Sequence, residues 1–452
     1  MSIRHPVAVF LCMTIAIGLL WSRALLSFAA PLLAFFAAVD IRIQPLKIKW
    51  LLTPTAIRAS IRGKPYMWVF TLFFLLYLLS GLYAGNLHEW WSLTHPKIPF
   101  LILPMAFAML DRFSKKEWMM VLLGMAFMTI WSSIWVQVAY YEDFELFNRS
   151  LGFGGSLPTP TDHIRYSVIV AMSMVTCLAF AIEDLRYRYP WERWAYGFFA
   201  LYLFYFLHIL SVRSGLAIGY AGIFFLVVFY LRHLHRWQQL VLLALMILAP
   251  LVAYKTMPGF QQKINYTLFD LEQFSRGEGE NYSDAERWQS WRAGIVVGNQ
   301  HPFFGTGTGH FRSELQAYYK TTLQRDTYER PHNQFINVFT LFGLFGLSVF
   351  LFVMIYPMTY AWFWKNPILP AFYGMQMISM MVEHPLDTSV GTLLFLLTIL
   401  MAMNYYEEEQ KAESREADRN AVKIPPNARH LLRESKGFRI FRKEILRIIL
   451  NY

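Results

Sequence analysis

The chain has 452 residues, of which 56% are hydrophobic and 16% charged, and its formal net charge is +11. Apolar runs recur along most of this length, which is typical of an all-α polytopic membrane protein. The positive charge does not indicate nucleic-acid binding, because the basic residues are divided among short loops and a C-terminal tail. There they are expected to face anionic lipid head groups.

About twelve apolar segments are candidate transmembrane helices, although several are shorter than the roughly 20 residues that an upright helix needs. They are Pro6 to Trp21, Ala24 to Val39, Tyr66 to Ala84, Ile98 to Leu110, Trp118 to Tyr140, Ile164 to Ile182, Trp194 to Leu210, Gly215 to Leu231, Leu240 to Tyr254, Phe335 to Met358, Ile368 to Met381 and Val390 to Met403.

Lysine and arginine are concentrated in the short loops on the side of the N-terminus, and such loops stay in the cytoplasm. We therefore expect both termini in the cytoplasm and one large exported loop. The predicted organisation is spans 1 to 9 in residues 1–254, a helical periplasmic loop in 255–334, spans 10 to 12 in 335–405, and a basic amphipathic tail in 406–452. The first apolar run lacks a cleavage site and is expected to remain as a span.

Both cysteines, Cys12 and Cys177, fall within predicted spans, so no disulfide is expected in the exported loop. In the tail, apolar residues from Phe438 to Ile449 recur at helical spacing between basic ones. This pattern predicts a helix lying in the plane of the membrane surface.

Within the exported loop, Asp284 to Gly298 is predicted to form a helix. Arg287 and Trp291 are four residues apart and share one helix face, as do Trp288 and Arg292. Two interpretations stay open: guanidinium groups presented to a substrate beside aromatic rings, or a solvated helix with one Trp packed on the bundle.

The next segment holds Gly305, Gly307 and Gly309, whose spacing permits a sharp turn and a close approach to another group. It does not match a phosphate-binding loop, which needs a different glycine spacing followed by Lys and Ser or Thr. A structural turn under a neighbouring site is the favoured interpretation.

Arg213 lies in a very short outer turn between two apolar spans, where a fixed charge is costly unless something pairs with it. An anionic ligand such as a lipid phosphate or diphosphate is one explanation, and a snorkelling side chain is the other. With Arg287, Arg292 and Arg330 it forms a possible anion clamp on the outer face.

His332 and Asn333 stand where the exported loop enters a new span, and Gly343 and Gly346 follow within that span. A histidine titrates near neutral pH, so His332 is a candidate general base, while the alternative is an anchor at the helix entrance.

These residues resemble the O-antigen ligase and polymerase superfamily of membrane glycosyltransferases. The motif formed by His332 and Asn333, nine further residues, and then Gly343 and Gly346 is similar to the ligase signature. The stretch from Arg287 through Trp291 to Gly309 is similar to the core of the family. Arg213 matches another family position. The resemblance implies a GT-C-like fold in a bacterial inner membrane, with the active site facing the periplasm.

The resemblance also implies a reaction: transfer of O-antigen glycan from undecaprenyl diphosphate to the lipid A-core oligosaccharide, inverting and without cofactor or metal. By this analogy His332 is the base on the acceptor hydroxyl, and Arg213 and Arg287 hold the diphosphate. Arg292, Arg330, Asn333, Trp291 and the three glycines of the loop are candidate substrate contacts. Polymerase, protein O-oligosaccharyltransferase and a lipid-linked oligosaccharide transporter stay open as alternatives.

Two acidic groups are weaker candidates. Glu383, His384 and Asp387 precede the last predicted span and could orient His332 or an arginine, or else be merely solvated. Glu142, Asp143 and Glu145 could hold a divalent cation but lack a histidine partner.

Overall fold

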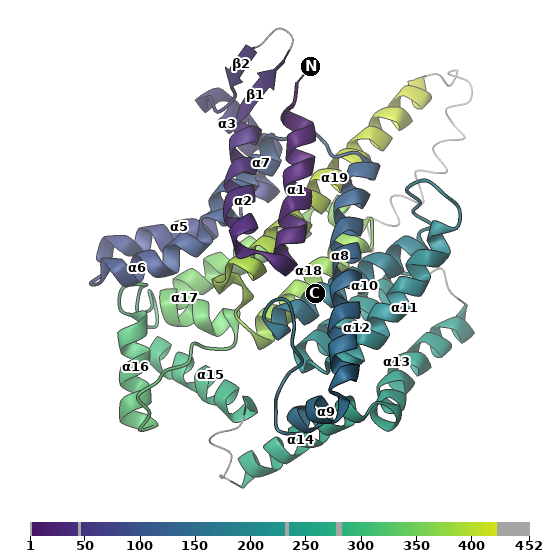
Figure 1. Ribbon diagram of the computed structural model, residues 1–452. Coiled ribbons are helices and arrows are strands. Elements are labelled where there is room, and N and C mark those ends of the chain that lie inside the picture. The colour runs from purple at the N-terminus through teal and green to yellow at the C-terminus, as the bar shows by residue number, and fades with distance from the viewer. Residues whose placement is uncertain (1, 44–46, 231–234, 277–282, 423–452) are drawn as a thin grey trace. The chain divides into compact units, whose positions relative to one another are not determined.

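The computed structural model describes residues 2–43, 47–230, 235–276 and 283–422. The chain divides into two compact units, Met1–Tyr405 and Tyr406–Tyr452. The first unit holds the helical bundle (Figure 1). Of the second unit the structure describes the residues up to Val422, the end of the last helix, so the amphipathic helix predicted from Phe438 to Ile449 lies outside the described residues.

The described chain is almost entirely helical, as predicted. The helices before the predicted exported loop are α1 (Arg4–Trp21), α2 (Arg23–Ala38), α3 (Pro54–Gly63), α4 (Pro65–Trp68), α5 (Thr71–Ser80), α6 (Leu87–Thr94), α7 (Pro99–Met109), α8 (Lys115–Glu142), α9 (Phe144–Gly152), α10 (His163–Ile182), α11 (Glu192–Leu210), α12 (Arg213–Tyr230) and α13 (Arg236–Thr256). The later helices are α14 (Pro258–Ser275), α15 (Ser283–Gln300), α16 (Phe311–Thr322), α17 (Gln334–Ile355), α18 (Ile368–Val382) and α19 (Ser389–Val422).

Short 3-10 helices and one hairpin complete the fold. The 3-10 helices are η1 (Gly81–Tyr83), η2 (His95–Lys97), η4 (Tyr356–Thr359), η5 (Ala361–Trp364) and η6 (Pro385–Asp387). The strands β1 (Val39–Arg42) and β2 (Lys47–Trp50) pair antiparallel, with Val39 opposite Trp50. This hairpin was not predicted from the sequence.

Nine helices in the described part of the chain are long and apolar enough to cross a membrane, and α2 and α18 are shorter apolar helices. Each of the twelve predicted spans overlaps a helix, but Tyr66 to Ala84 is divided among α4, α5 and η1. However, α7 has 11 residues, which at 1.5 Å per residue gives only about 16 Å, roughly half of the hydrocarbon thickness. Twelve complete crossings and their topology therefore stay predictions.

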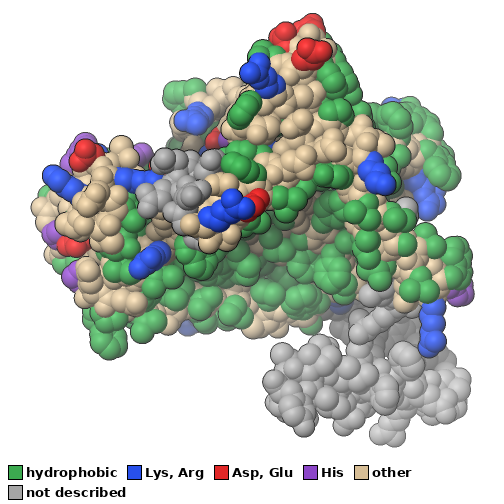
Figure 2. All heavy atoms as spheres, turned by 90° about the horizontal axis from the view of Figure 1, so that it is seen from below, with side chains coloured by type: hydrophobic (Ala, Val, Ile, Leu, Met, Phe, Trp, Pro, Cys, Tyr) green, Lys and Arg blue, Asp and Glu red, His purple; other side chains and the backbone are tan. Residues whose placement is uncertain are grey.

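The surface and the interior of the bundle differ as lipid contact requires. Helix α10 and the segment Ser389–Glu407 of α19 are the most buried spans, at 78% and 94%, and α10 packs against α8, α11, α12 and α18. Large apolar side chains such as Phe28, Trp194 and Leu201 are exposed. Figure 2 shows hydrophobic side chains over much of one face.

The helices of the predicted exported loop gather at one end of the bundle. Helices α14, α15 and α16 lie there together with α9, whereas the β-hairpin, α3 and the N-terminus lie at the opposite end (Figure 1). Helix α15 packs against α14, α16 and α17, so the loop is folded onto the bundle. Both cysteines are buried in helices, in α1 and α10, as predicted.

Helix α17 is broken at Gly343, where the backbone has φ 62° and ψ −160°. The segment after α15 fills this break: the amide N–H of Gly307 donates to the carbonyl of Leu341 at 2.9 Å, and that of Leu344 donates to Pro302 at 2.8 Å. A Cβ at position 343 would lie 2.4 Å from the carbonyl carbon of Phe303. Only glycine fits this conformation and this contact.

We expect Gly343→Ala to lower the free energy of unfolding by at least about 2 kcal/mol, because the backbone conformation is strained for any residue with a Cβ. Thermal unfolding in detergent, followed with a thiol-reactive fluorophore that reports exposure of Cys12 and Cys177, measures the change. The matched control is Gly197→Ala in α11, where an added Cβ would meet only ordinary contacts. Equal unfolding temperatures for the two variants would contradict the prediction.

Candidate active site

The backbone of His332 is fixed from two sides just before α17 begins. The indole N–H of Trp291 donates to the carbonyl oxygen of His332 at 2.8 Å, and the amide of His332 donates to the hydroxyl of Ser290 at 3.2 Å. Both partners lie on α15. The helix predicted from Asp284 to Gly298 is therefore present, as part of α15, and it holds the histidine in place.

Asn333 caps α17. Its side-chain oxygen accepts from the amides of Phe335 and Ile336 at 2.9 and 3.1 Å, and its amide nitrogen donates to the carbonyl of Met381 at 2.8 Å. Satisfying free N–H groups at a helix start is a typical role for asparagine. These contacts join the start of α17 to the end of α18, and a substrate contact by Asn333 stays a prediction.

The carboxylate of Glu383 lies between His332 and Arg287. Its Oε2 is 3.0 Å from Nδ1 of His332, and its Oε1 accepts from Nη2 of Arg287 at 2.8 Å. The Glu383 side chain is only 11% exposed, so these charges interact where water screens them weakly. The structure thus brings together two residues predicted for the site, through a glutamate that had been only a weak candidate.

This arrangement favours a protonated imidazole. Burial alone lowers the pKa of His332, but the neighbouring carboxylates of Glu329 and Glu383 outweigh it and raise the pKa to about 9. Burial raises the pKa of Glu383, but His332 and Arg287 lower it below its usual value. At rest the centre is therefore an imidazolium and a guanidinium on one carboxylate.

Glu329 faces the other ring nitrogen of His332. Its carboxylate oxygen lies 3.8 Å from Nε2, and its side chain is 57% exposed. The two carboxylates thus differ in kind: Glu383 is buried and held on both oxygens, whereas Glu329 stands in solvent. A ligand hydroxyl approaching Nε2 would take the place of Glu329.

His384 completes a group that resembles a metal-binding set. Ligand atoms of His332, Glu383 and His384 all lie within 4.8 Å of one another. A divalent cation would have to displace the Arg287 guanidinium from Glu383 and the proton from His332, because metal ligands bind deprotonated. The charges therefore favour the ion-paired arrangement over a metal centre.

Beneath this group, Lys97 and Asp387 form a buried ion pair. The Lys97 ammonium lies 2.5 Å from Oδ1 of Asp387, and the side chains are only 1% and 6% exposed. Lys97 also donates to the carbonyl of Leu386, and Asn337 on α17 donates to Oδ2 of Asp387 at 2.7 Å. Burial alone raises the pKa of Asp387, but Lys97 holds it well below its usual range. The pair fixes the turn that carries Glu383.

The remaining predicted arginines are distributed around the centre. Arg213 begins α12, and its Nη1 donates to the hydroxyl of Thr267 on α14 at 3.3 Å; α14 in turn packs against α15. Nη1 of Arg330 lies 4.0 Å from Asp387. Arg292 is exposed on the side of α15 that also exposes Trp288. The structure therefore joins Arg287 to His332 through Glu383, and it places Arg330 beside Asp387.

The glycines of the predicted turn pack against the protein. Gly305 and Gly307 have positive φ, 67° and 69°. A Cβ at Gly305 would meet the α17 backbone near Leu341, and one at Gly309 would meet Ala84. Their contacts support α17 below His332, as the structural interpretation expected, and contact with substrate stays a prediction.

Lys97 and Glu329 were not among the residues predicted for the site, and Glu383 was only a weak candidate. The partner of Lys97 is 290 positions away in the sequence. The available signal was the cluster of Glu383, His384 and Asp387 in one short turn between apolar helices. There, charged residues are costly unless they are paired.

Residues 197–351 match the family described as O-antigen ligase. The matched segment includes Arg213, Arg287, His332 and Gly343, and it ends before Glu383. A search of curated proteins gave no match. The segment that matches the family thus supplies the histidine and two arginines, and the part of the chain that follows supplies the carboxylate joining His332 to Arg287.

We expect Lys97→Met to destabilise the protein by about 3–5 kcal/mol, because it leaves the Asp387 carboxylate buried without its partner. The double variant Lys97→Met with Asp387→Asn should recover much of this loss, since neither charge then stays buried alone. Thermal unfolding with the cysteine-reactive dye compares the variants. A single variant as stable as the wild type, or a double variant no better than the single, would contradict the ion-pair assignment.

We expect His332 to titrate near pH 9 in the folded protein, and Glu383→Gln to lower its pKa. The pKa of His332 in the folded protein lies above the unfolded value of about 6.5. The free energy that the protonated His332 contributes to folding is therefore complete below about pH 6.5 and is lost as the pH rises through about 9. NMR of ring-labelled histidines measures the titration, with His332→Gln assigning the signal. Glu142→Gln, at an exposed site, is the control; a wild-type pKa near 6.5 would sink the prediction.

Proposed function

We propose that the protein is an inverting, metal-independent membrane glycosyltransferase. It transfers O-antigen glycan from undecaprenyl diphosphate to the lipid A-core oligosaccharide, on the periplasmic face of the bacterial inner membrane. The segment that matches the O-antigen ligase family and the helical bundle support this class of enzyme. The observation that carries the proposal is the Glu383 carboxylate, which holds the His332 imidazole at 3.0 Å and the Arg287 guanidinium at 2.8 Å.

His332 is the proposed general base. Glu383 accepts a hydrogen bond from the N–H at Nδ1 and so directs Nε2 toward the acceptor, as the carboxylate does in the His–carboxylate pairs of hydrolases. The acceptor oxygen attacks the anomeric carbon, the bond from that carbon to the diphosphate oxygen breaks, and the hydroxyl proton passes to Nε2. The diphosphate leaves on its lipid.

Arg287 and Arg213 are the proposed diphosphate contacts. Negative charge accumulates on the leaving diphosphate in the transition state, and guanidinium groups already in place stabilise it without reorganisation. Arg287 donates one N–H to Glu383. Its planar guanidinium has further N–H donors, whose geometry suits phosphate oxygens. Arg213 would approach from α12, beside α14.

His332 is protonated at rest, and it must lose this proton before it can act as a base. With a pKa of about 9, the neutral form is on the order of 1% at pH 7. An acceptor that displaces the Glu329 carboxylate from Nε2 removes one of the charges that hold the proton. Activity should consequently rise with pH until His332 is neutral.

We expect His332→Ala to reduce transfer at least 10²-fold, the lower range for loss of a general base, and the wild-type rate to increase between pH 7 and 9. The assay uses purified protein, a defined undecaprenyl-diphosphate glycan and lipid A-core acceptor, with and without EDTA. EDTA should not change the rate, because the proposed site holds no metal. The matched control is His88→Ala, at an exposed position of α6.

Three outcomes would count against the proposal. Normal transfer by His332→Ala removes the base assignment. A rate that falls as pH rises shows that His332 acts as a cation on the diphosphate instead. Uptake into vesicles without any glycan transfer in detergent favours a transporter, since detergent leaves no second compartment to fill.

A further inference from the structure

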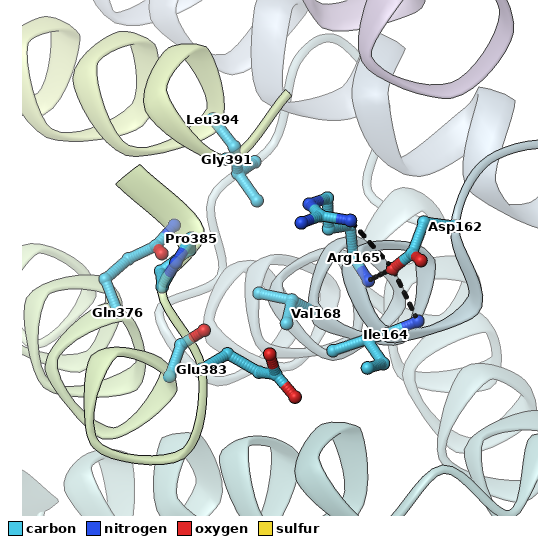
Figure 3. Close-up of a pocket in the computed structure, with 10 residues that line it drawn as sticks. Asp162, Ile164, Arg165, Val168, Gln376, Glu383, Pro385, Gly391 and Leu394 are labelled. Atoms are coloured by element: carbon cyan, nitrogen blue, oxygen red, sulfur yellow. Dashed lines mark hydrogen bonds and ion pairs between the residues drawn. The ribbon is translucent and has the colours of Figure 1, made fainter. Parts of the chain in front are cut away.

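Two spaces in the described part of the chain differ in what they can hold. The space beside Glu383, between the start of α10, α18 and the start of α19, has a volume of about 30 Å³, which admits water but no larger ligand (Figure 3). The other space is an open cleft of about 440 Å³ between α9 and the start of α14. Its volume lies within the range of roughly 300–1,000 Å³ for small-molecule sites.

The cleft lies where two long apolar helices end. Helix α8 ends at Glu142, just before α9, and α13 ends at Thr256, just before α14. Helices α9 and α14 pack against each other at the end of the bundle that carries the predicted exported loop (Figure 1). Aromatic rings gather here: Phe144 stacks on Tyr141 at 6.1 Å, and Phe153 is 76% exposed. Such rings at the ends of spans are typical of the boundary between lipid and water.

Hydrogen bonds fix the walls of this cleft. The side-chain oxygen of Asn148, a buried lining residue, accepts from the hydroxyl of Tyr140 at 2.9 Å. From α14, the ammonium of Lys263 donates to the carbonyls of Gly154 and Gly155 at 2.8 and 2.9 Å. These contacts hold α9 on the end of α8 and the segment after α9 on α14. The cleft is therefore formed by the protein itself.

Two opposite charges line the cleft. Glu145 and Arg149 are four residues apart on α9, and both side chains are exposed. A glutamate and an arginine at this spacing often form an ion pair. Both residues lie in the described part of the chain, and they do not form an ion pair with each other. A ligand that enters the cleft thus meets one carboxylate and one guanidinium.

These charges select among ligands. Glu142, Asp143 and Glu145 were candidate ligands for a divalent cation, but among the described residues such ligand atoms converge only around His332. Of the three acids only Glu145 lines the cleft. Its carboxylate would repel a diphosphate, which carries several negative charges. A ligand with one charge of each sign can satisfy both Glu145 and Arg149.

We propose that the cleft binds the phosphoethanolamine head group of a membrane phospholipid. Its phosphate accepts from the guanidinium of Arg149, and its primary ammonium donates to the carboxylate of Glu145. Four residues rise about 6 Å along a helix, and the two charges of this head group are separated by a distance of the same order. The acyl chains lie along the exposed ring of Phe153. A glycan could use the polar groups of the cleft but would leave this apolar edge in water.

The bound lipid would stabilise the part of the chain that carries two of the candidate site arginines. Helix α14 continues from the cleft to Thr267, whose hydroxyl accepts from Arg213 at 3.3 Å. The same helix packs against α15, which carries Arg287. A head group held at the start of α14 therefore acts on the position of this helix. Binding itself does not depend on the proposed function.

Competition between two phospholipids tests the proposal. Full-length protein in detergent receives equal amounts of phosphatidylethanolamine and phosphatidylglycerol with the same acyl chains, and native mass spectrometry counts the bound lipids. We expect the wild type to prefer phosphatidylethanolamine about 3-fold, as one exposed charge pair allows. Glu145→Gln should bind both lipids without preference, because only the ammonium loses its partner. Arg149→Gln should bind both less, because each has a phosphate.

Matched controls change the same residue types outside the cleft. Glu142→Gln, three residues before Glu145, and Arg23→Gln, at the start of α2, should keep the wild-type preference. Equal binding of the two lipids by the wild type, or an unchanged preference in Glu145→Gln, overturns the proposal. Saturation-transfer NMR that detects a delipidated glycan in the wild type but not in the cleft variants would assign the cleft to a glycan instead. No glycosyl transfer is measured, so failure of the proposed function leaves these results unaffected.

Discussion

The interaction on which the candidate site depends is the sharing of one buried carboxylate between two cations. Glu383 ends α18, Arg287 lies on α15 and His332 precedes α17. The Glu383 side chain is only 11% exposed. A carboxylate buried to this extent is stable as an anion only when it is paired. Here it is held by both partners, so the three segments can satisfy their charges only when they are folded against one another. The site and the fold of the predicted exported loop thus have a common electrostatic requirement.

A second buried ion pair, Lys97 with Asp387, fixes the turn that carries Glu383. Asp387 lies four residues after Glu383 in the same turn, and it binds Lys97 from η2 and Asn337 from α17. Buried ion pairs contribute little net stability but are costly to break, which makes them effective at fixing geometry. Because one short turn holds both carboxylates, a displacement of the turn would leave two anions without partners. This couples the position of Glu383 to the packing of the bundle.

The apolar segments in the sequence predicted the helical bundle well, because each of them overlaps a helix. They did less well at lengths: α7 is short, and α13 begins at Arg236, before the predicted span. Sequence also placed Arg287 and Trp291 on one helix face, which the structure confirms through their contacts with Glu383 and His332. The pairing of Glu383 could not be predicted, because its partners are 96 and 51 positions away. Helical periodicity reports on neighbours within a few residues and not on such contacts.

The two carboxylates beside His332 divide the control of its charge. Glu383 is buried and fixed, so it keeps Nδ1 protonated and the ring oriented whatever the substrate does. Glu329 is exposed and 3.8 Å from Nε2, so its influence depends on what else occupies that position. An acceptor hydroxyl that replaces it removes a negative charge from the imidazole and makes the neutral form easier to reach. In the proposed mechanism, His332 thus becomes available as a base when the acceptor is in place. When the acceptor is absent, a diphosphate-linked donor meets a cationic site that binds it without activating water.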